Sequence, residues 1–306
     1  MEYVKYESVK DDFISIAWYV GSTCNYSCSY CIPDFYDGKK KFPPYEPFLD
    51  FADRVQEKYP DKRILLTLYG GEVTLWKKFE EFLDLCKSKS IEVRIVSNGS
   101  RSISWWKRVA PKLNYTVISY HTEFATEEHI IEVMKTLTNK GGHLNLMVKH
   151  DAFDSTIEIG KRISEECKVM VVPRFLRVNF TTELYPYTED QLKLFKRTPL
   201  GNRYLDQGEY RYYGMMVKTE TGAVRRFPNV RHIFFNKLNR WKGWKCWGGI
   251  DSFFVDYDGN IYLGQCRRGK FGVLGEDYNI PNEPFICDKD ICNCTQDMLE
   301  AKKEKV

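Results

Sequence analysis

The sequence lacks the features that would place it in a membrane or outside the cell. In 306 residues there is no apolar run long enough to span a bilayer. The N-terminal segment has no basic stretch followed by an apolar stretch, the pattern of a secretory signal. No low-complexity tract, long linker or internal repeat interrupts the chain. With 43% hydrophobic and 29% charged residues, the composition is that of a globular protein, which we expect in the cytoplasm.

The sequence also has a small net charge and few histidines, but it has many cysteines. The formal charge of +4 is small for this length and says little about partners. The first of only five histidines is His121, so a zinc site joining an N-terminal cysteine pair to two nearby histidines is disfavoured. In a chain without a secretory signal, ten cysteines indicate metal binding in a reducing compartment rather than disulfides.

Three of the cysteines lie within eight residues, in the segment Cys24-Asn-Tyr-Ser-Cys28-Ser-Tyr30-Cys31. Cysteine thiolates hold iron–sulfur clusters, usually four per cubane. Three thiols directly after the apolar run Phe13–Val20 therefore suggest a cluster with one iron left to bind a reacting ligand. Two isolated cysteines, Cys86 and Cys167, are interpreted as small buried hydrophobic residues.

Five further cysteines crowd into the last fifth of the chain and predict a second metal region: Cys246, Cys266, Cys287, Cys292 and Cys294. A hairpin between the first two, with Asp258-Gly259 at its turn, can bring both thiols to one place. The terminal three could then complete a four-ligand site. From spacing alone, zinc and an iron–sulfur cluster both remain open as the metal.

The first two thirds of the chain alternate β-rich runs with helical stretches, which predicts a parallel sheet with helices outside. Three of the strands are largely apolar, so we expect both sheet faces to be covered. Six β–α units are too few for a complete eight-unit barrel. The predicted strands are Phe13–Val20, Arg63–Tyr69, Glu92–Ser97, Asn114–Ser119, His143–Val148 and Lys168–Phe175. The helices are Pro47–Lys58, Trp76–Lys89, Ser102–Ala110, Thr126–Lys140 and Asp154–Glu166, with a sixth from Thr188.

The last third changes character and predicts two hairpins and a charged tail. The hairpins pair Tyr212–Lys218 with Ala223–Phe227, and Ser252–Asp256 with Ile261–Leu263. The tail, ending Glu-Ala-Lys-Lys-Glu-Lys-Val, is predicted to be a frayed helix. We expect three parts: a core at residues 1–200, a connecting hairpin and basic aromatic segment at 201–245, and a cysteine-rich domain at 246–306.

The spacing C-x3-C-x2-C, with an aromatic before the last cysteine, resembles the signature of the radical S-adenosylmethionine (SAM) enzymes. Leu68-Tyr69-Gly70-Gly71-Glu72-Val73-Thr74-Leu75 resembles that family's GGEPTL segment, with valine where proline is common. The resemblance implies an open (β/α)6 arc, that is, a partial TIM-like barrel of the α/β class. It also implies a [4Fe–4S] cluster on Cys24, Cys28 and Cys31 whose fourth iron binds SAM. Reduced by a donor such as flavodoxin or ferredoxin, the cluster would cleave SAM to a 5′-deoxyadenosyl radical that abstracts hydrogen.

The same resemblance implies SAM-binding roles for residues that follow the strands. Glycine pairs at a strand end let backbone approach a ligand, and a carboxylate can accept hydrogen bonds from an ammonium group. Lys149 and His150 offer further charge, or are solvated residues at a strand end. The expected cofactor-binding residues are Tyr30 against adenine, Gly70, Gly71 and Glu72 at the amino group, Asn98 in a T-N-G-like turn, His121 at the ribose or carboxylate or as a proton carrier, and Arg174 at a carboxylate.

The C-terminal cysteines resemble the auxiliary-cluster domain called twitch or SPASM. The spacing from Gly259 to Cys266 is longer than the glycine-x4-cysteine spacing of that domain. The C-terminal cysteines are also too few to hold the two clusters of a full SPASM domain. One auxiliary [4Fe–4S] cluster, on Cys246, Cys266, Cys292 and Cys294 with Cys287 uncertain, is therefore expected. It would transfer electrons or anchor the substrate.

The substrate itself stays open among a peptide, a small molecule and a nucleic acid. Lys218 to Lys245 holds basic residues interleaved with aromatics, which suits nucleic acid or an acidic peptide but more often forms a solvated face over an aromatic core. A non-enzymatic zinc or iron–sulfur module is the remaining alternative, and the Gly-Gly-Glu segment argues against it.

Overall fold

The computed structural model describes residues 2–8, 12–137, 141–180, 183–197, 215–227, 233, 236–292, 298 and 300–306. The helices are α1 Glu46–Lys58, α2 Phe79–Ser88, α3 Ile103–Val109, α4 Glu127–Leu137, α5 Phe153–Cys167 and α6 Glu189–Arg197. The strands of the first two thirds are β1 Tyr3–Ser8, β2 Phe13–Tyr19, β3 Arg63–Tyr69, β4 Glu92–Ser97, β5 Tyr115–Tyr120, β6 Gly142–Val148 and β7 Met170–Phe175. The later strands are β8 Met215–Thr219, β9 Val224–Phe227, β10 Lys245–Cys246, β11 Ser252–Val255, β12 Asn260–Tyr262, β13 Lys270–Val273, β14 Phe285–Ile286 and β15 Lys303–Glu304.

The six predicted β–α units are all present, from β2 and α1 to β7 and α6. Their predicted strand bounds agree with the structure to within two residues. The strand order in each sheet is linear, so no closed barrel forms within the described part of the chain. The α/β fold with an open sheet is therefore confirmed.

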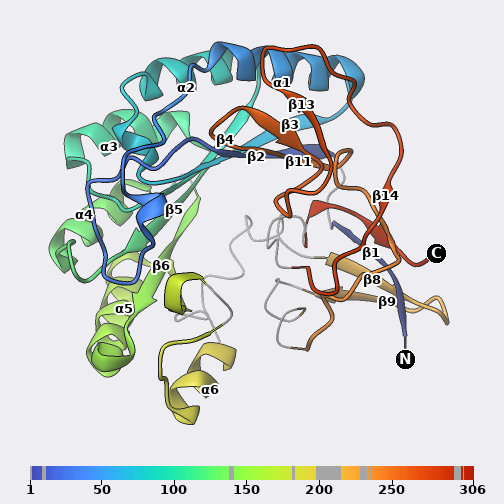
Figure 1. Ribbon diagram of the computed structural model, residues 1–306. Coiled ribbons are helices and arrows are strands. Elements are labelled where there is room, and N and C mark those ends of the chain that lie inside the picture. Colours follow the sequence, from blue (N-terminus) through green and yellow to red (C-terminus); the bar gives the residue numbers. More distant parts are fainter. Residues whose placement is uncertain are drawn as a thin grey trace. The chain divides into compact units, whose positions relative to one another are not determined.

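The chain divides into two compact units, and one of the breaks between them falls inside β3, between Thr67 and Leu68. The second unit comprises residues 20–42 and 68–208. In it β4, β5, β6 and β7 pair in parallel, in that order. Helices α2 to α5 lie along one side of this sheet (Figure 1). The carboxyl ends of these strands carry the loops in which chemistry is expected in such sheets.

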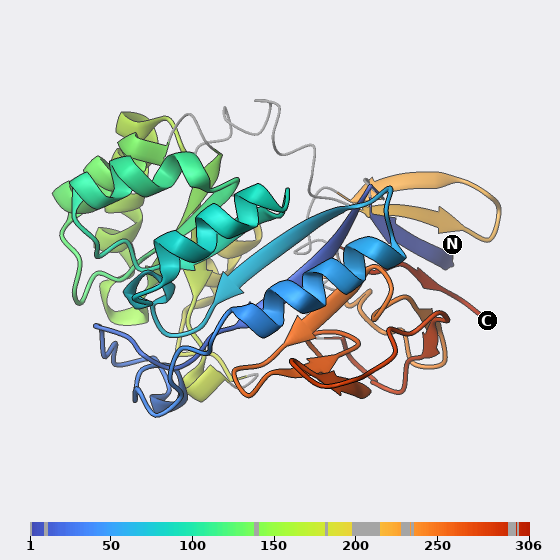
Figure 2. The ribbon, with the colours of Figure 1, turned by 90° about the horizontal axis from the view of Figure 1, so that it is seen from above.

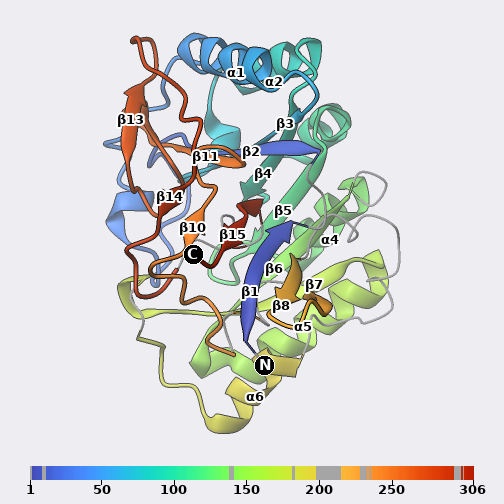
Figure 3. The same ribbon diagram turned by 90° about the vertical axis from the view of Figure 1, so that its right-hand side faces the viewer.

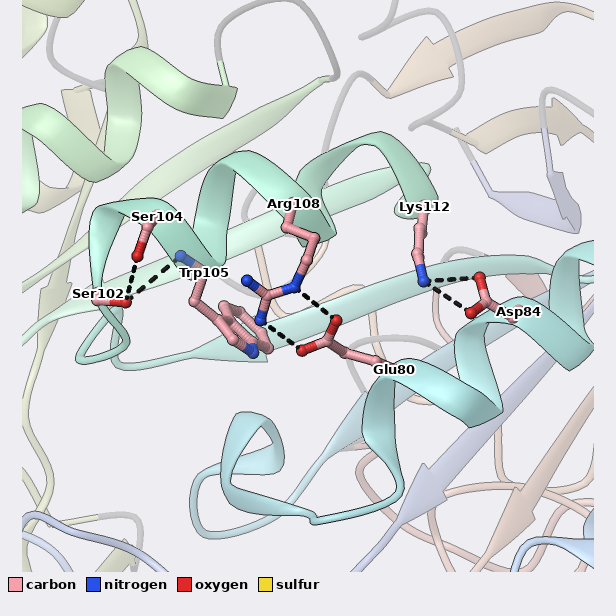
Figure 4. Close-up of polar contacts among 7 residues, drawn as sticks. All are labelled: Glu80, Asp84, Ser102, Ser104, Trp105, Arg108 and Lys112. Atoms are coloured by element: carbon pink, nitrogen blue, oxygen red, sulfur yellow. Dashed lines mark hydrogen bonds and ion pairs between the residues drawn. The ribbon is translucent and has the colours of Figure 1, made fainter.

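Ion pairs tie neighbouring helices of this layer together on the outside (Figure 4). Arg108 of α3 forms a two-pronged pair with Glu80 of α2, with nitrogen–oxygen distances of 2.9 and 2.8 Å. Lys112, just beyond α3, bonds Asp84 at 2.8 Å. The hydrogen bond from Arg108 lowers the pKa of Glu80 below its ordinary value.

This lowered pKa predicts a small, pH-dependent contribution to stability. A carboxylate whose pKa is depressed by folding stabilises the folded state above its unfolded pKa and loses that contribution as the pH falls. Glu80→Gln should therefore slightly lower the free energy of unfolding in urea at pH 7 and leave it unchanged near pH 3. Glu165→Gln, at an exposed glutamate of α5, is the control. A difference of the same size at both pH values would contradict the pairing.

The first unit comprises residues 1–19, 43–67 and 209–306. One of its sheets has the order β14-β10-β15-β1-β8-β9, and Figure 3 shows β1 beside β8 and β15. The N-terminal strand β1 has no counterpart in the sequence prediction. It is held because Tyr6 packs with Met215, Val217, Phe227 and Trp241 in one apolar cluster.

The predicted frayed helix at the charged tail is wrong for residues 303 and 304, which form strand β15 between β1 and β10. Pairing on both edges makes extended backbone the better conformation, whatever the helix propensity of the tail. The side chain of Lys303 is only 1% exposed, donates to the Ala301 carbonyl at 2.5 Å and lies over the Trp241 ring at 4.9 Å. The lysine that favoured a solvated tail is thus part of the core.

Both predicted hairpins are present, as β8–β9 and β11–β12, and the first projects as a two-stranded ribbon (Figure 2). Residues 212–214 of the first lie outside the described residues. In the basic segment, Phe227 and Trp241 are buried whereas Lys218 and Arg225 are exposed. This is the arrangement of a charged surface above an aromatic core.

One expectation about the sheet faces is wrong. β2 is buried at every residue, but β3 alternates half-buried with fully buried positions, so only one of its faces is fully covered. A run of apolar residues does not reveal this, because leucine occupies both kinds of position in β3. Among helices in the described ranges, none combines the length and apolar character needed to cross a bilayer.

Candidate functional site

The three cysteines of the N-terminal motif lie on the loop that follows β2, in the second unit. Cys28 is buried, and Cys24 and Cys31 are partly exposed. The Tyr26 amide donates to the Cys24 sulfur at 3.3 Å, and the Cys31 amide donates to the Cys28 carbonyl at 2.9 Å. Backbone hydrogen bonds thus fix the shape of the loop around all three sulfurs.

The electrostatics of the cysteine loop favour binding of a positively charged group. Burial raises the pKa of the Cys28 thiol to about 12, and the neighbouring Cys31 and Cys24 add to it. Burial raises the pKa of the Cys31 thiol to about 11, and the neighbouring Cys24 is the second cause of this rise. Three thiolates so close together repel one another unless a cation lies between them, and a coordinated metal deprotonates a thiol outright. The donor set therefore fits an iron–sulfur cluster, which cysteine thiolates hold.

The end of β3 lies directly against this loop. The Gly71 amide donates to the Gly21 carbonyl at 2.8 Å, and the Glu72 amide donates to the Thr23 carbonyl at 2.7 Å. A β-carbon added at Gly71 would lie 2.8 Å from the Phe35 carbonyl oxygen and still closer to that of Thr23. Glycine is thus needed here for close backbone approach, as the sequence predicted, although the backbone it meets is that of the cysteine loop.

Glu72 is fully buried and accepts hydrogen bonds from neighbouring protein groups. One carboxylate oxygen accepts from the Thr74 amide at 3.1 Å, the Thr74 hydroxyl at 2.6 Å and the Ser97 hydroxyl at 2.8 Å. The other accepts from the Asn98 amide at 2.6 Å. Burial raises its pKa, and these donors oppose the rise. Glu72 therefore ties the end of β3 to the end of β4, while contact with SAM stays a prediction.

This tie predicts that Glu72→Ala will lower stability as well as SAM affinity. Four donors would lose their acceptor in a buried site, which costs roughly 3 kcal/mol or more of unfolding free energy. Glu72→Gln keeps an oxygen for three of the donors and should lose less. Urea unfolding and equilibrium dialysis with SAM measure the two effects. Wild-type stability combined with weakened SAM binding would contradict the tie and favour direct contact.

Asn98 links the turn after β4 to the cysteine loop. Its side-chain amide donates to the Asn25 side-chain oxygen at 3.0 Å and lies 3.9 Å from the Cys24 sulfur. The next residue, Gly99, has a φ of +76°, and its carbonyl pairs with the His129 ring at 2.9 Å. The predicted Asn-Gly turn is thus present, and it holds a donor against the first cysteine.

His121, after β5, packs on the cysteine loop. Its Nδ1 lies 2.8 Å from the Tyr30 hydroxyl and 3.4 Å from the Cys28 sulfur, and its ring stacks on that of Tyr30 with centroids 5.9 Å apart. Burial lowers the pKa of His121 to about 4, so the imidazole is neutral at pH 7. These contacts make His121 a support for Tyr30, while its predicted role at SAM or as a proton carrier stays a prediction.

Comparison with known families identifies this region. A sequence model of the radical SAM superfamily matches residues 18–141, which include the cysteine loop, Gly70 to Glu72, Asn98 and His121. The chain carries a radical SAM domain. The predicted resemblance to this superfamily is confirmed, and an iron–sulfur cluster and SAM are the cofactors that the family implies.

Solved structures of radical SAM enzymes share the fold. Streptococcus suis SuiB bound to the precursor peptide SuiA matches with a TM-score of 0.56 and 14% identity, covering 88% of this chain and 66% of that one. SuiB bound to S-adenosylmethionine matches with a TM-score of 0.53 and 14% identity, covering 88% of this chain and 63% of that one. Native anSMEcpe with bound AdoMet matches with a TM-score of 0.53 and 14% identity, covering 86% of this chain and 78% of that one. The chain thus spans less than two thirds of SuiB, and at this identity the likeness establishes the fold. No curated protein matches the sequence.

Sequence reasoning missed a second support of the radical SAM domain's cysteine loop. The Glu123 carboxylate accepts from the Ser29 amide at 2.8 Å and from the Ser29 hydroxyl at 2.5 Å, and it pairs with Lys149 at 3.1 Å. Burial alone would raise the pKa of Glu123, but these partners outweigh it and leave the pKa lowered. Lys149 is thus engaged by a carboxylate, and His150 stacks on Tyr185 with ring centroids 5.5 Å apart. The only sequence signal was the position of Glu123 directly after a strand.

The C-terminal cysteines lie in the first unit. Cys246 is on β10, paired with Phe285 of β14, so it lies close in register to Cys287. After burial, Cys292 and Cys266 are the next causes that raise the pKa of Cys287, so these thiols are also near one another. Cys287, the uncertain member of the predicted set, is therefore placed with the others. Cys294 lies outside the described residues.

In the described ranges, no three His, Cys, Asp or Glu side chains are placed to hold a single metal ion. Cys86 and Cys167 are buried, with 0% and 3% exposure, in α2 and at the end of α5. They occupy core positions, as interpreted from the sequence.

Proposed function

We propose that the chain binds a [4Fe–4S] cluster through Cys24, Cys28 and Cys31, and that it uses SAM and this cluster to abstract hydrogen from a substrate. The observation that carries the proposal is the arrangement of these three cysteines inside a radical SAM domain. When bound, the reduced cluster supplies the electron that cleaves SAM to methionine and a 5′-deoxyadenosyl radical. The electron comes from an external donor such as flavodoxin or ferredoxin.

The chain's own residues would position SAM around this site. Gly70 and Gly71 expose backbone at the end of β3, next to the cysteine loop, where an amino group can be bound. Tyr30 offers an aromatic face held in place by His121. Asn98 holds a donor against the first cysteine, which is the kind of bond that tunes a cluster's potential.

We further propose that the first unit binds an auxiliary [4Fe–4S] cluster through four of Cys246, Cys266, Cys287, Cys292 and Cys294. The rise that Cys292 and Cys266 cause in the pKa of Cys287 supports this grouping. The Cys287 amide donates to the Trp244 carbonyl at 2.8 Å, and the Asn239 side chain donates to the Cys292 carbonyl at 2.8 Å. Two of the thiols are thus fixed by backbone hydrogen bonds. The auxiliary cluster would take up an electron from the substrate radical or anchor the substrate.

The first experiment is to count iron and sulfide per chain in anaerobically reconstituted protein, alongside dithionite-driven SAM cleavage. We expect about eight irons and formation of 5′-deoxyadenosine. About four irons with cleavage would keep the radical SAM activity and assign the C-terminal cysteines to zinc or to structure. Zinc alone, without cleavage, would contradict the proposal and favour a non-enzymatic metal module.

A further inference from the structure

The six-stranded sheet of the first unit has one face that carries charged side chains. Its other face contributes Tyr6, Met215, Val217 and Phe227 to an apolar cluster. Residues that lie directly opposite each other on paired strands point to the same face, so the register identifies the members of the charged face. One row of such residues crosses all six strands from β14 to β9: Ile286, Lys245, Glu304, Lys5, Lys218 and Val224.

A second, shorter row lies beside the first. Glu7 of β1 pairs with Met216 of β8, which pairs with Arg226 of β9. We call the two rows together the outer sheet face. At the two ends of the longer row, Val224 and Ile286 are 57% and 50% exposed. The outer sheet face thus combines cations with exposed aliphatic groups.

The carboxylates of the outer sheet face are already paired with lysines. Lys5 Nζ lies 2.5 Å from Glu7 Oε2, and Lys302 Nζ lies 2.9 Å from Glu304 Oε2. The hydrogen bond from Lys302 is the first cause of a lowered pKa at Glu304, and the charges of Lys5 and Lys245 add to it. Both acids are therefore ionised and neutralised within the protein.

Three cations of the outer sheet face are left over. In the part of the chain that the structure describes, no carboxylate lies within ion-pair distance of Lys218, Lys245 or Arg226. Lys218 also stands directly opposite Lys5, and like charges opposite each other on paired strands are destabilising. An anion bound over this face would remove the repulsion.

The outer sheet face ends at an edge that is open to a further strand. β9 is last in the strand order, and no described strand pairs with its outer side. Its residues Val224, Arg225 and Arg226 are exposed on a ribbon that projects from the unit (Figure 2). An edge strand offers unpaired N–H and C=O groups to an extended chain. Two adjacent arginines disfavour pairing with a second copy of this edge and favour a chain with carboxylates at the matching positions.

We propose that β9 receives an extended acidic segment of a partner protein as a seventh strand of this sheet. Main-chain hydrogen bonds to β9 supply affinity in this kind of recognition, and alternate side chains supply specificity. Carboxylates beside Arg225 and Arg226, and an aliphatic side chain beside Val224, complement the edge. The segment would therefore contain two consecutive acidic residues next to an aliphatic one. This inference is independent of the proposed function.

A single-stranded nucleic acid is the other polyanion that a basic surface can bind. Proteins hold such strands by stacking bases on aromatic side chains as well as by cations. No member of the outer sheet face, as defined by its two rows, is aromatic. The observations therefore favour a peptide, and an RNA oligonucleotide is included in the test.

The test is a fluorescence anisotropy titration of anaerobically reconstituted full-length protein. The probe is Thr-Val-Glu-Glu-Val-Thr with fluorescein at its N-terminus and an amide at its C-terminus. Its pattern reads the same in both directions, so it fits β9 as a parallel or an antiparallel strand. We expect saturable binding that weakens several-fold between about 50 and 500 mM NaCl. Thr-Pro-Glu-Glu-Pro-Thr keeps the charge but lacks two N–H donors, and it should bind at least about tenfold more weakly.

Arg226→Glu should weaken binding of the probe by at least about threefold, because it replaces an attraction by a repulsion. Arg226→Gln, which only removes the charge, is the second variant if the reversal is not tolerated. Lys270→Glu is the matched control, since Lys270 is an exposed cation on β13, the edge strand of the other sheet. Hydrogen exchange in β9 should slow when the probe is bound, because its outer N–H groups become bonded.

Absence of saturable binding, or equal loss in Arg226→Glu and Lys270→Glu, would overturn the proposal. Equal binding of the proline peptide, or unchanged hydrogen exchange in β9, would show attraction of charge without an added strand and would overturn it as well. A short oligouridine that binds more tightly than the probe and depends on Arg226 would assign the face to nucleic acid instead. Iron content and SAM cleavage of the same samples report separately on the proposed function.

Discussion

Cys28→Ala is expected to abolish formation of 5′-deoxyadenosine from SAM. A cubane that keeps one iron open needs three thiolates, and the variant leaves only two. The buried position of Cys28 between Tyr30 and His121 gives water no easy access as a replacement ligand. About four of eight irons should be lost, and those of the C-terminal cysteines should remain. Iron analysis and chromatography of the dithionite-driven reaction measure both quantities.

Cys86→Ala is the matched control for this experiment. Cys86 is likewise a buried cysteine of the second unit, but it lies in α2 within the core. The control should lose some stability, because a small cavity remains, and keep its iron and its cleavage activity. Persistent 5′-deoxyadenosine formation in Cys28→Ala would show that the core cluster has been assigned to the wrong residues.

Gly71→Ala is expected to remove most of the core cluster, although residue 71 contributes no ligand. The added methyl group would collide with the carbonyl oxygens of Thr23 and Phe35, which belong to the backbone of the cysteine loop and its continuation. Backbone cannot rotate away as a side chain can, so the loop must shift. Overpacking of this kind costs about 1–3 kcal/mol. Iron content after reconstitution should fall by about the four core irons.

Gly222→Ala is the control that separates this collision from the backbone strain of placing alanine at a positive φ. Gly222 has a φ of +82°, but a methyl group there would meet nothing within 4 Å. The control should therefore lose roughly 1 kcal/mol of stability from the left-handed backbone and bind its normal complement of iron. Equal iron loss in both variants would mean that general destabilisation, and not displacement of the cysteine loop, is responsible.

The sequence predicted the repeating part of the fold well, because β–α units leave strong local signals. Apolar runs marked the six strands, and helical stretches between them marked the helices, some with a capping residue such as Thr126 or Thr188. It failed where long-range pairing decides the conformation. Strand β1 and strand β15 are short and charged, and each becomes a strand only because of the neighbour that the fold supplies. Nothing local in Lys303 and Glu304 indicates an extended conformation.

The sequence predicted those parts of the candidate site that are recognised by the spacing of residues along the chain. The cysteine triplet and the Gly-Gly-Glu segment were both recognised from the residues alone. Contacts between side chains from different loops were not, because they depend on which strand ends lie side by side. Glu123 on Ser29 is of this kind.

The pairing of Lys5 with Glu304 has a consequence for how the chain folds during synthesis. The sheet that contains β1 cannot be completed until residue 304 has left the ribosome, and pairing across such a separation is slow. Strands β4 to β7 have only short connections and can pair much earlier. We therefore expect the part of the fold that holds the C-terminal cysteines to be completed last. Their exposure to oxygen before metal arrives would then limit the yield of complete protein.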